Sequence, residues 1–175
     1  MRYRGPAYRA HSPKWSWAPL SGEGAERHGG RFNRRGQSAL YLATDLVTAV
    51  REFAQTFPFK LVPPITIVSY DVDCDHIVDL TQPSVRRQMK VTPSQLACTD
   101  WRALQSTGKP VPSQDIANQP LGDGVAGILV RSFAPGAAEN DVNLVLWKWS
   151  TRLPHKIAVH DPDGALPKDG KSWGR

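Results

Sequence analysis

The chain has 175 residues, of which 40% are hydrophobic, and it carries a formal net charge of +6. This length and composition predict one globular domain that is large enough to build its own core, and they exclude a disordered or collagen-like chain. No apolar run reaches the ~18 residues that a membrane span needs. The basic N-terminus is not followed by the apolar run of a signal peptide, so we expect a cytoplasmic protein. The two cysteines, Cys74 and Cys98, are too few and too far apart for a zinc site or a redox pair, and we interpret them as buried thiols.

The first part of the chain predicts a short strand, a short helical segment and a buried strand. The short strand is expected near residues 8–10, and the helical segment begins after a turn at residues 21–25. Gly29 and Gly30 are expected to end that segment, because glycine adopts the backbone angles of a tight stop. The apolar run over residues 38–43 is typical of a buried strand.

Residues 45–57 form the clearest predicted helix. Thr44 is a suitable N-cap, since its hydroxyl can accept a hydrogen bond from the first turn. Glu52 lies on the polar face of this helix, with Thr48 and Gln55. The apolar residues recur at helical spacing and predict a single apolar face, made of Leu46, Val47, Val50, Phe53, Ala54 and Phe57.

The remainder of the chain predicts five further strands, two helical pieces and a loop. The helical pieces lie within residues 84–107 and are separated at Pro93, and a loop or lid covers residues 108–124. The segment 161–175 is a polar tail that is loosely held, so the folded domain covers residues 1–160. The five strands are expected over residues 65–70, 77–80, 125–130, 142–147 and 156–160.

The first candidate site is the run Gly-Gly-Arg-Phe-Asn at residues 29–33. Two glycines let the backbone approach a ligand closely, and the guanidinium of Arg31 can make paired hydrogen bonds to a diphosphate. The alternative is a glycine-terminated helix followed by a surface arginine, and composition alone does not decide between the two.

Glu52 is the second candidate. On a solvated polar face it would be an ordinary surface glutamate. If that face lines a cleft instead, its carboxylate can stabilise positive charge that develops at an anomeric carbon.

Ser132 is the third candidate, because it follows an apolar strand, and small polar residues at strand ends often contact ligands. Such residues also begin turns. A hydrolase triad is not predicted, since Ser132 has no His-Asp pair and no G-x-S-x-G elbow around it. The five histidines lack metal-ligand spacing, so we expect no metal site.

In combination, these pieces resemble the RES-domain family, whose toxins are named for an arginine, a glutamate and a serine. The resemblance covers roughly residues 3–150, keeps the motifs in order and leaves residues 58–120 unmatched. It is carried by Ser-Gly-Glu-Gly-Ala at 21–25, Gly-Gly-Arg-Phe-Asn at 29–33, Ala-Leu-Tyr-Leu-Ala at 39–43, Glu52, Gly-Ile-Leu-Val-Arg-Ser at 127–132 and Asn-Leu-Val-Leu-Trp at 143–147.

The resemblance implies an α/β (α+β) fold similar to that of ADP-ribosyltransferases, with mixed sheets and flanking helices, in a single RES-like NAD-binding catalytic domain over residues 1–160. It implies that Arg31 holds the diphosphate of NAD⁺, that Tyr41 packs near the nicotinamide–ribose end and that Glu52 stabilises the ribosyl cation. It also places three residues among those that bind NAD⁺: Ser132, Asn33 and Asn143.

Cleavage of the nicotinamide–ribose bond needs no metal, because nicotinamide is a cationic leaving group and the protein supplies orientation and a negative charge. Transfer of ADP-ribose to a protein is the favoured outcome, because the charged Arg131 beside the expected site and the long unmatched loop could receive a protein target. Phosphorolysis or hydrolysis of NAD⁺ is the alternative.

The expected partner is an acidic, Xre-like antitoxin that blocks the site, and nucleic acid is contacted only through that antitoxin. A basic nucleic-acid-binding module is the distant alternative, since the basic residues form no stripe.

Overall fold

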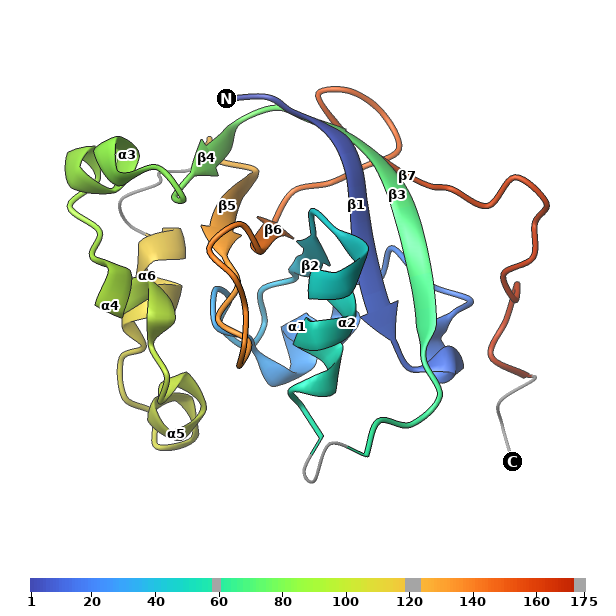
Figure 1. The fold of residues 1–175 in the computed structure, drawn as a ribbon, viewed down its shortest axis with the longest axis horizontal. Helices are drawn as coiled ribbons and strands as arrows, with labels where there is room; N and C mark the ends of the chain where they lie inside the picture. The colour runs from blue at the N-terminus through green and yellow to red at the C-terminus, as the bar shows by residue number, and fades with distance from the viewer. Residues whose placement is uncertain (58–60, 119–123, 172–175) are drawn as a thin grey trace.

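Seven strands form one mixed sheet in the computed structural model, which describes residues 1–57, 61–118 and 124–171 (Figure 1). The order across the sheet is β4-β5-β6-β2-β1-β3-β7, in which β4 and β5 are parallel and every other pair is antiparallel. This architecture confirms the expected α/β fold. The strands are β1 (Tyr3–His11), β2 (Leu40–Ala43), β3 (Thr66–Cys74), β4 (Ile77–Asp79), β5 (Gly127–Arg131), β6 (Val142–Leu146) and β7 (His155–Val159).

The helices lie in two places. Helix α2 crosses in front of the middle of the sheet, whereas α3 to α6 gather beyond β4 and β5 (Figure 1). The helices in the described ranges are α1 (Glu23–His28), α2 (Leu46–Ala54), α3 (Pro83–Gln88), α4 (Pro93–Ala97), α5 (Trp101–Ser106) and α6 (Pro112–Asn118), with a 3-10 turn, η1 (Pro13–Trp15).

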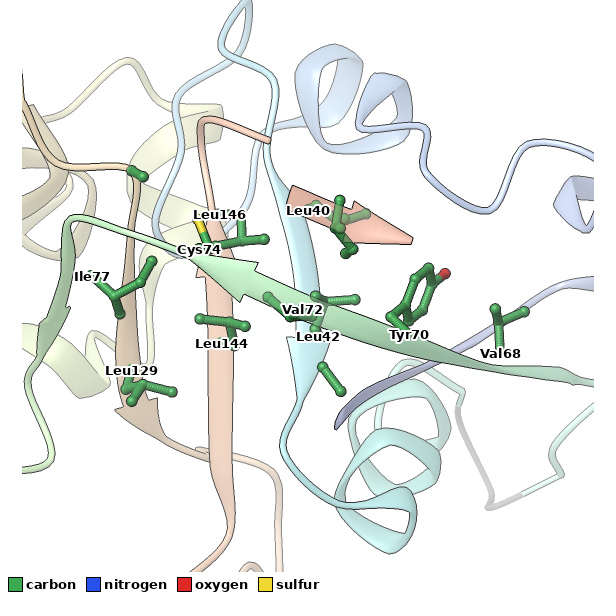
Figure 2. Close-up of a cluster of buried hydrophobic side chains, with 13 residues drawn as sticks. Leu40, Leu42, Val68, Tyr70, Val72, Cys74, Ile77, Leu129, Leu144 and Leu146 are labelled. Carbon is green, nitrogen blue, oxygen red and sulfur yellow. The ribbon is translucent and has the colours of Figure 1, made fainter. Parts of the chain in front are cut away.

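The core has two parts because strand side chains alternate between the two faces of the sheet. Leu144 and Leu146 of β6 belong to the first part, and Val145 between them belongs to the second. The first part continues across the whole sheet (Figure 2) and includes Leu40, Leu42, Val68, Tyr70, Val72, Cys74, Ile77 and Leu129. The second part joins β5 and β6 to the helical segment through Leu80, Val91, Leu96, Ile116, Ile128 and Val130.

The sheet is divided at its centre. Strands β1 and β3 pair over nine residues, from Tyr3–Cys74 to His11–Thr66, whereas β1 and β2 pair only at Tyr8 and Ala43. Beyond that one pair the two strands separate. The candidate site described below occupies the resulting gap.

Helix α2 corrects two expectations. It is capped by Asp45 and not by Thr44, because the Asp45 carboxylate accepts a hydrogen bond from the backbone N–H of Thr48. The expected apolar face is also wrong at Leu46 and Val47, which are 46% and 61% exposed, whereas its other four members are partly buried. The helix instead buries Thr48 and Ala49, two small residues that allow it to lie close to β1.

The segment after β4 contains more helix than expected. Residues 84–107 were expected to form two helical pieces but form three helices, α3, α4 and α5. Helix α4 starts at a capping box made by Thr92 and Gln95 and ends at Cys98. The expected loop over 108–124 contains α6, whose Ile116 is 4% exposed and anchors this helix in the core. Residues 119–123 of that expected loop lie outside the described residues.

The predicted strands are all present, with different bounds in places. Strand β1 extends over Gly5 and Pro6, which lie outside the strand expected near residues 8–10, because its full length pairs with β3. Cys74 and Cys98 are both buried, as expected, and burial raises the pKa of the Cys74 thiol to about 11. In the tail, Leu166 packs against the first part of the core.

Candidate active site

A cleft of about 390 Å³ lies where β1 and β2 separate. Its walls come from β1, α1 and the loop after it, β2, α2, α5 and β6. The cleft is lined by both polar and apolar residues, and those that matter most below are Arg9, Arg31, Tyr41, Glu52, Arg102 and Asn143. Three of these are arginines and one is a carboxylate, and the lining contains no other Asp, Glu, Lys or Arg, so the described lining is electropositive.

Glu52 projects from α2 into this cleft and is held there by neutral donors. The hydroxyl of Ser132 and the side-chain amide of Asn143 each donate to its Oε1 at 2.5 Å. The amide of Gln55 donates to Oε2. Within the described ranges Glu52 forms no ion pair, so its negative charge is oriented but not neutralised by a contacting cation.

The register of β5 and β6 brings Ser132 and Asn143 to the same place. Val130 pairs with Asn143 in the sheet, and the N–H of Ser132 donates to the carbonyl of Asp141 at 2.7 Å. Ser132 is 8% exposed and lies behind Glu52, outside the cleft lining. The structure therefore brings three of the predicted site residues together, although they are up to 91 positions apart in the sequence.

Arg31 lines the cleft from the loop that follows α1. Its guanidinium donates to the carbonyl of Ala97 and lies 4.7 Å from the centre of the Phe133 ring. Burial lowers the pKa of Arg31, and the nearby charge of Glu52 partly offsets that effect. A half-buried guanidinium that remains charged and forms no ion pair with a described carboxylate is suited to binding an anionic ligand.

Tyr41 presents its ring to the cleft and uses its hydroxyl to hold the loop of Arg31. The hydroxyl accepts from the N–H of Phe32 at 3.0 Å and donates to Oδ1 of Asn33 at 2.8 Å. Burial raises the pKa of Tyr41, so the hydroxyl stays protonated. A Cβ on Gly30 would lie 2.3 Å from that hydroxyl oxygen, which explains why this position is glycine.

Asn33 lies beneath the loop and does not line the cleft. It is fully buried, and its amide nitrogen donates to the carbonyls of Ala25, Arg34 and Gln37 at 2.8, 3.1 and 2.8 Å. These hydrogen bonds shape the loop that presents Arg31.

A model of the RES domain matches residues 6–169 of the chain. The chain belongs to the RES-domain family. Among solved structures, it is similar to a chain of the M. tuberculosis MbcT–MbcA toxin–antitoxin complex, with 22% sequence identity and a TM-score of 0.59. The similarity covers 92% of this chain and 84% of that one, and it shows a shared fold. No curated protein sequence matches the chain.

Four features of this RES domain's cleft were not predicted from the sequence. Arg9 is one residue of strand β1, and no local motif marks it. Trp101 and Arg102 belong to α5, in the segment that no motif matched. Phe133 follows Ser132 and stacks on Arg31. Of these four residues, only Phe133 could have been proposed from the sequence, because it lies next to the candidate Ser132 at the end of a predicted strand.

One expected feature lies elsewhere. Arg131 forms an ion pair with Glu139 and does not line the cleft, so its position gives no support to the expectation that it receives a protein target.

Among the residues that the RES-domain structure describes, no group of three His, Cys, Asp or Glu side chains could hold a metal ion. No helix in the described segments is long and apolar enough to cross a membrane.

Proposed function

We propose that this RES domain is the toxin of a bacterial toxin–antitoxin pair and that it cleaves NAD⁺ at the nicotinamide–ribose bond. The observation that carries this proposal is the arrangement of Glu52, held by Ser132 and Asn143, in a cleft that Arg31 also lines. Departure of nicotinamide leaves positive charge on the ribose. A carboxylate that is already oriented stabilises that charge without reorganisation.

The other groups position the substrate. Arg31 offers a planar cation to the diphosphate, since among the described residues its guanidinium donates to one backbone carbonyl, lies over the Phe133 ring and forms no ion pair. Tyr41 offers its ring face to the nicotinamide–ribose end. In this assignment Ser132, Asn33 and Gly30 position other residues and do not contact NAD⁺ themselves. Asn143 donates to Glu52 and also lines the cleft.

The finer proposal is transfer of ADP-ribose to a protein. The cleft contains three arginines, and Arg102 lies at an exposed position on α5, so an anionic acceptor is favoured. An acidic protein side chain satisfies that requirement. Inorganic phosphate satisfies it equally, which makes NAD⁺ phosphorolysis the second candidate.

The proposed partner is an acidic, Xre-like antitoxin that covers the cleft, and the proposed compartment is the cytoplasm. The similar M. tuberculosis chain was solved in a toxin–antitoxin complex. The net charge of +6 on this chain favours an acidic surface on its partner.

The test is a Glu52→Gln variant incubated with NAD⁺ that is labelled in its adenylate phosphate. We expect nicotinamide release to fall at least about a hundredfold, because the amide keeps the shape of the carboxylate but not its charge. Glu139→Gln is the matched control, since Glu139 is an exposed glutamate outside the cleft. Equal release from both variants would contradict the proposal.

The same incubation in cell extract identifies the acceptor. Label on protein supports ADP-ribosyl transfer, label in ADP-ribose 1″-phosphate supports phosphorolysis, and label in free ADP-ribose supports hydrolysis. Omitting phosphate from the buffer separates the first two reactions further.

A further inference from the structure

A second cavity adjoins the cleft. This side pocket has a volume of about 190 Å³ and lies between the end of β1, η1 and α1. Arg9 and Gly24 line both cavities, so the two are neighbours along one surface. The side pocket is lined by Arg9, His11, Trp15, Ala18, Pro19, Ser21, Glu23, Gly24, Arg27 and His28.

His11 lines the side pocket and has one ring nitrogen without a hydrogen-bond partner in the described structure. The side chain is 7% exposed, and its Nε2 is buried without a partner in the described structure. Its Nδ1 lies 3.0 Å from the carbonyl of Ser12. A carbonyl can only accept, so Nδ1 carries the proton and Nε2 of the neutral ring must accept. Burial lowers the pKa of His11, which keeps the ring neutral at pH 7.

Two further residues define what the side pocket can hold. Trp15 is 55% exposed, so its indole offers a free aromatic surface at the wall. The guanidinium of Arg9 donates to the carbonyls of Pro19 and Ser21 at 3.2 and 3.1 Å, and no described carboxylate forms an ion pair with it. Arg27 differs, because Glu23 on the same helix balances its charge.

These features together require a flat aromatic group that carries an N–H donor and is joined to an anion. The ring would stack on Trp15, its donor would meet Nε2 of His11, and the anion would lie toward Arg9 at the junction with the cleft. Adenine meets the first two requirements through its ring and its 6-amino group. A phosphate linked through ribose meets the third.

We propose that the side pocket binds the adenine end of NAD⁺ and selects it through the 6-amino group, which donates to His11. This inference rests on the proposed function, in which the nicotinamide end and the diphosphate lie in the main cleft. It assigns base specificity to His11 and base affinity to Trp15, two residues outside the Arg31–Glu52 site.

The test is equilibrium binding of adenosine diphosphate and inosine diphosphate, measured by calorimetry without turnover. Inosine replaces the 6-amino donor with a carbonyl acceptor, which cannot pair with Nε2 of His11. We expect the wild-type protein to bind adenosine diphosphate about tenfold more tightly, which corresponds to one good hydrogen bond. His11→Leu should abolish that preference, and His11→Gln, which keeps a carbonyl acceptor, should restore part of it.

Trp15→Ala should weaken binding of both nucleotides about tenfold, because stacking does not depend on the 6-substituent. Trp17→Ala is the matched control, since Trp17 is an exposed neighbour that does not line the side pocket. Equal binding of the two nucleotides by the wild type, no binding of either at millimolar concentration, or no effect of Trp15→Ala would each overturn the inference.

The binding assay and the cleavage assay fail separately. If NAD⁺ is cleaved but the two nucleotides bind equally, the proposed function stands and the side pocket does not select adenine. If the adenine preference is found and depends on His11, but no nicotinamide is released, the side pocket stands and the proposed function fails.

Discussion

Gly30 shows how one missing side chain shapes the site. Its Cα approaches Tyr41 and Asn33 so closely that a Cβ would lie 2.3 Å from the Tyr41 hydroxyl and 2.5 Å from Asn33 Oδ1. Both atoms are already hydrogen-bonded to each other and cannot move independently. We expect Gly30→Ala to lower the free energy of unfolding by about 2–3 kcal/mol, by overpacking and by breaking that buried hydrogen bond.

Gly24 provides the matched control for this prediction. It lies in the first turn of α1, and a Cβ there would have no neighbour within 4 Å. Gly24→Ala should therefore leave stability unchanged or raise it by about 0.5–1 kcal/mol. Denaturant melts of the two variants measure the difference. Equal stability of both variants would show that the loop around Tyr41 accommodates a methyl group easily.

Arg31 is expected to bind the diphosphate through its planar shape as well as its charge. Arg31→Ala should weaken NAD⁺ binding by about 1.5–3 kcal/mol, and Arg31→Lys should recover only part of that loss, because an ammonium cannot form two parallel hydrogen bonds. Calorimetry on the Glu52→Gln background measures binding without cleavage. Arg35→Ala, which changes an exposed arginine outside the cleft, controls for general attraction. Full affinity in the lysine variant would contradict a planar grip.

At the residue scale the sequence predicted the groups that belong to compact motifs. Arg31 and Glu52 were proposed from the order of those motifs, and the structure places both in one cleft. Arg9 and His11 could not be found in that way. They are ordinary members of a strand, and their importance comes from the loop after η1, which folds over them and forms the side pocket.

The start of α2 makes a pH-dependent contribution to stability. Burial opposes ionisation of Asp45, but the hydrogen bonds from Thr48 prevail and hold the pKa of that carboxyl below its ordinary value of 3.8. A group with a lowered folded-state pKa stabilises the protein above its unfolded-state pKa and loses that effect as the pH falls through the folded-state value. The stabilisation by the Asp45 charge is therefore fully present at neutral pH and decreases progressively as the pH falls below about 4.

We expect Asp45→Ala to cost about 1 kcal/mol at pH 7, as loss of an N-cap does. Asp45→Asn keeps a capping oxygen but has no charge, so the wild type should be the more stable of the two at pH 7. Thermal melts between pH 7 and pH 3 measure this advantage. The advantage should shrink as the pH falls through the lowered folded-state pKa of Asp45, and an advantage that does not change with pH would show that the charge of Asp45 contributes nothing.

Whole elements were predicted where local pattern and tertiary packing agree. The strands over β2, β5 and β6 are short apolar runs that are buried on both faces, and the sequence located them within a few residues. Helix α2 was located, but its buried side was misassigned, because periodicity measures hydrophobicity and cannot show that a cleft lies on the polar side. Helix α6 was missed because its polar sequence gains its stability from Ile116, a residue that packs only once the fold exists.

At the scale of the whole molecule, the proposed toxin activity requires that the proposed antitoxin block the cleft until it is needed. We expect an acidic antitoxin to insert a segment near Arg31 and Glu52 and to compete with NAD⁺. The apparent inhibition constant should then rise in proportion to NAD⁺ concentration, which steady-state assays of nicotinamide release can measure. Inhibition that is independent of NAD⁺ concentration would indicate a remote mechanism.

Association of this chain with an acidic antitoxin should also slow as the salt concentration is raised, because opposite charges accelerate the encounter of the two proteins and salt screens them.

The single pairing between β1 and β2 gives the sheet inner edges as well as outer ones. An open sheet has two outer edges, here β4 and β7, whose unpaired backbone groups can bind another chain. Past Tyr8, residues 9–11 of β1 pair with β3 on one side and with no described strand on the other. Every second residue there directs its N–H and C=O toward the gap. These backbone donors and acceptors are the same whatever side chains the strand carries, so this wall of the cleft keeps its hydrogen-bonding groups through substitutions that preserve the strand.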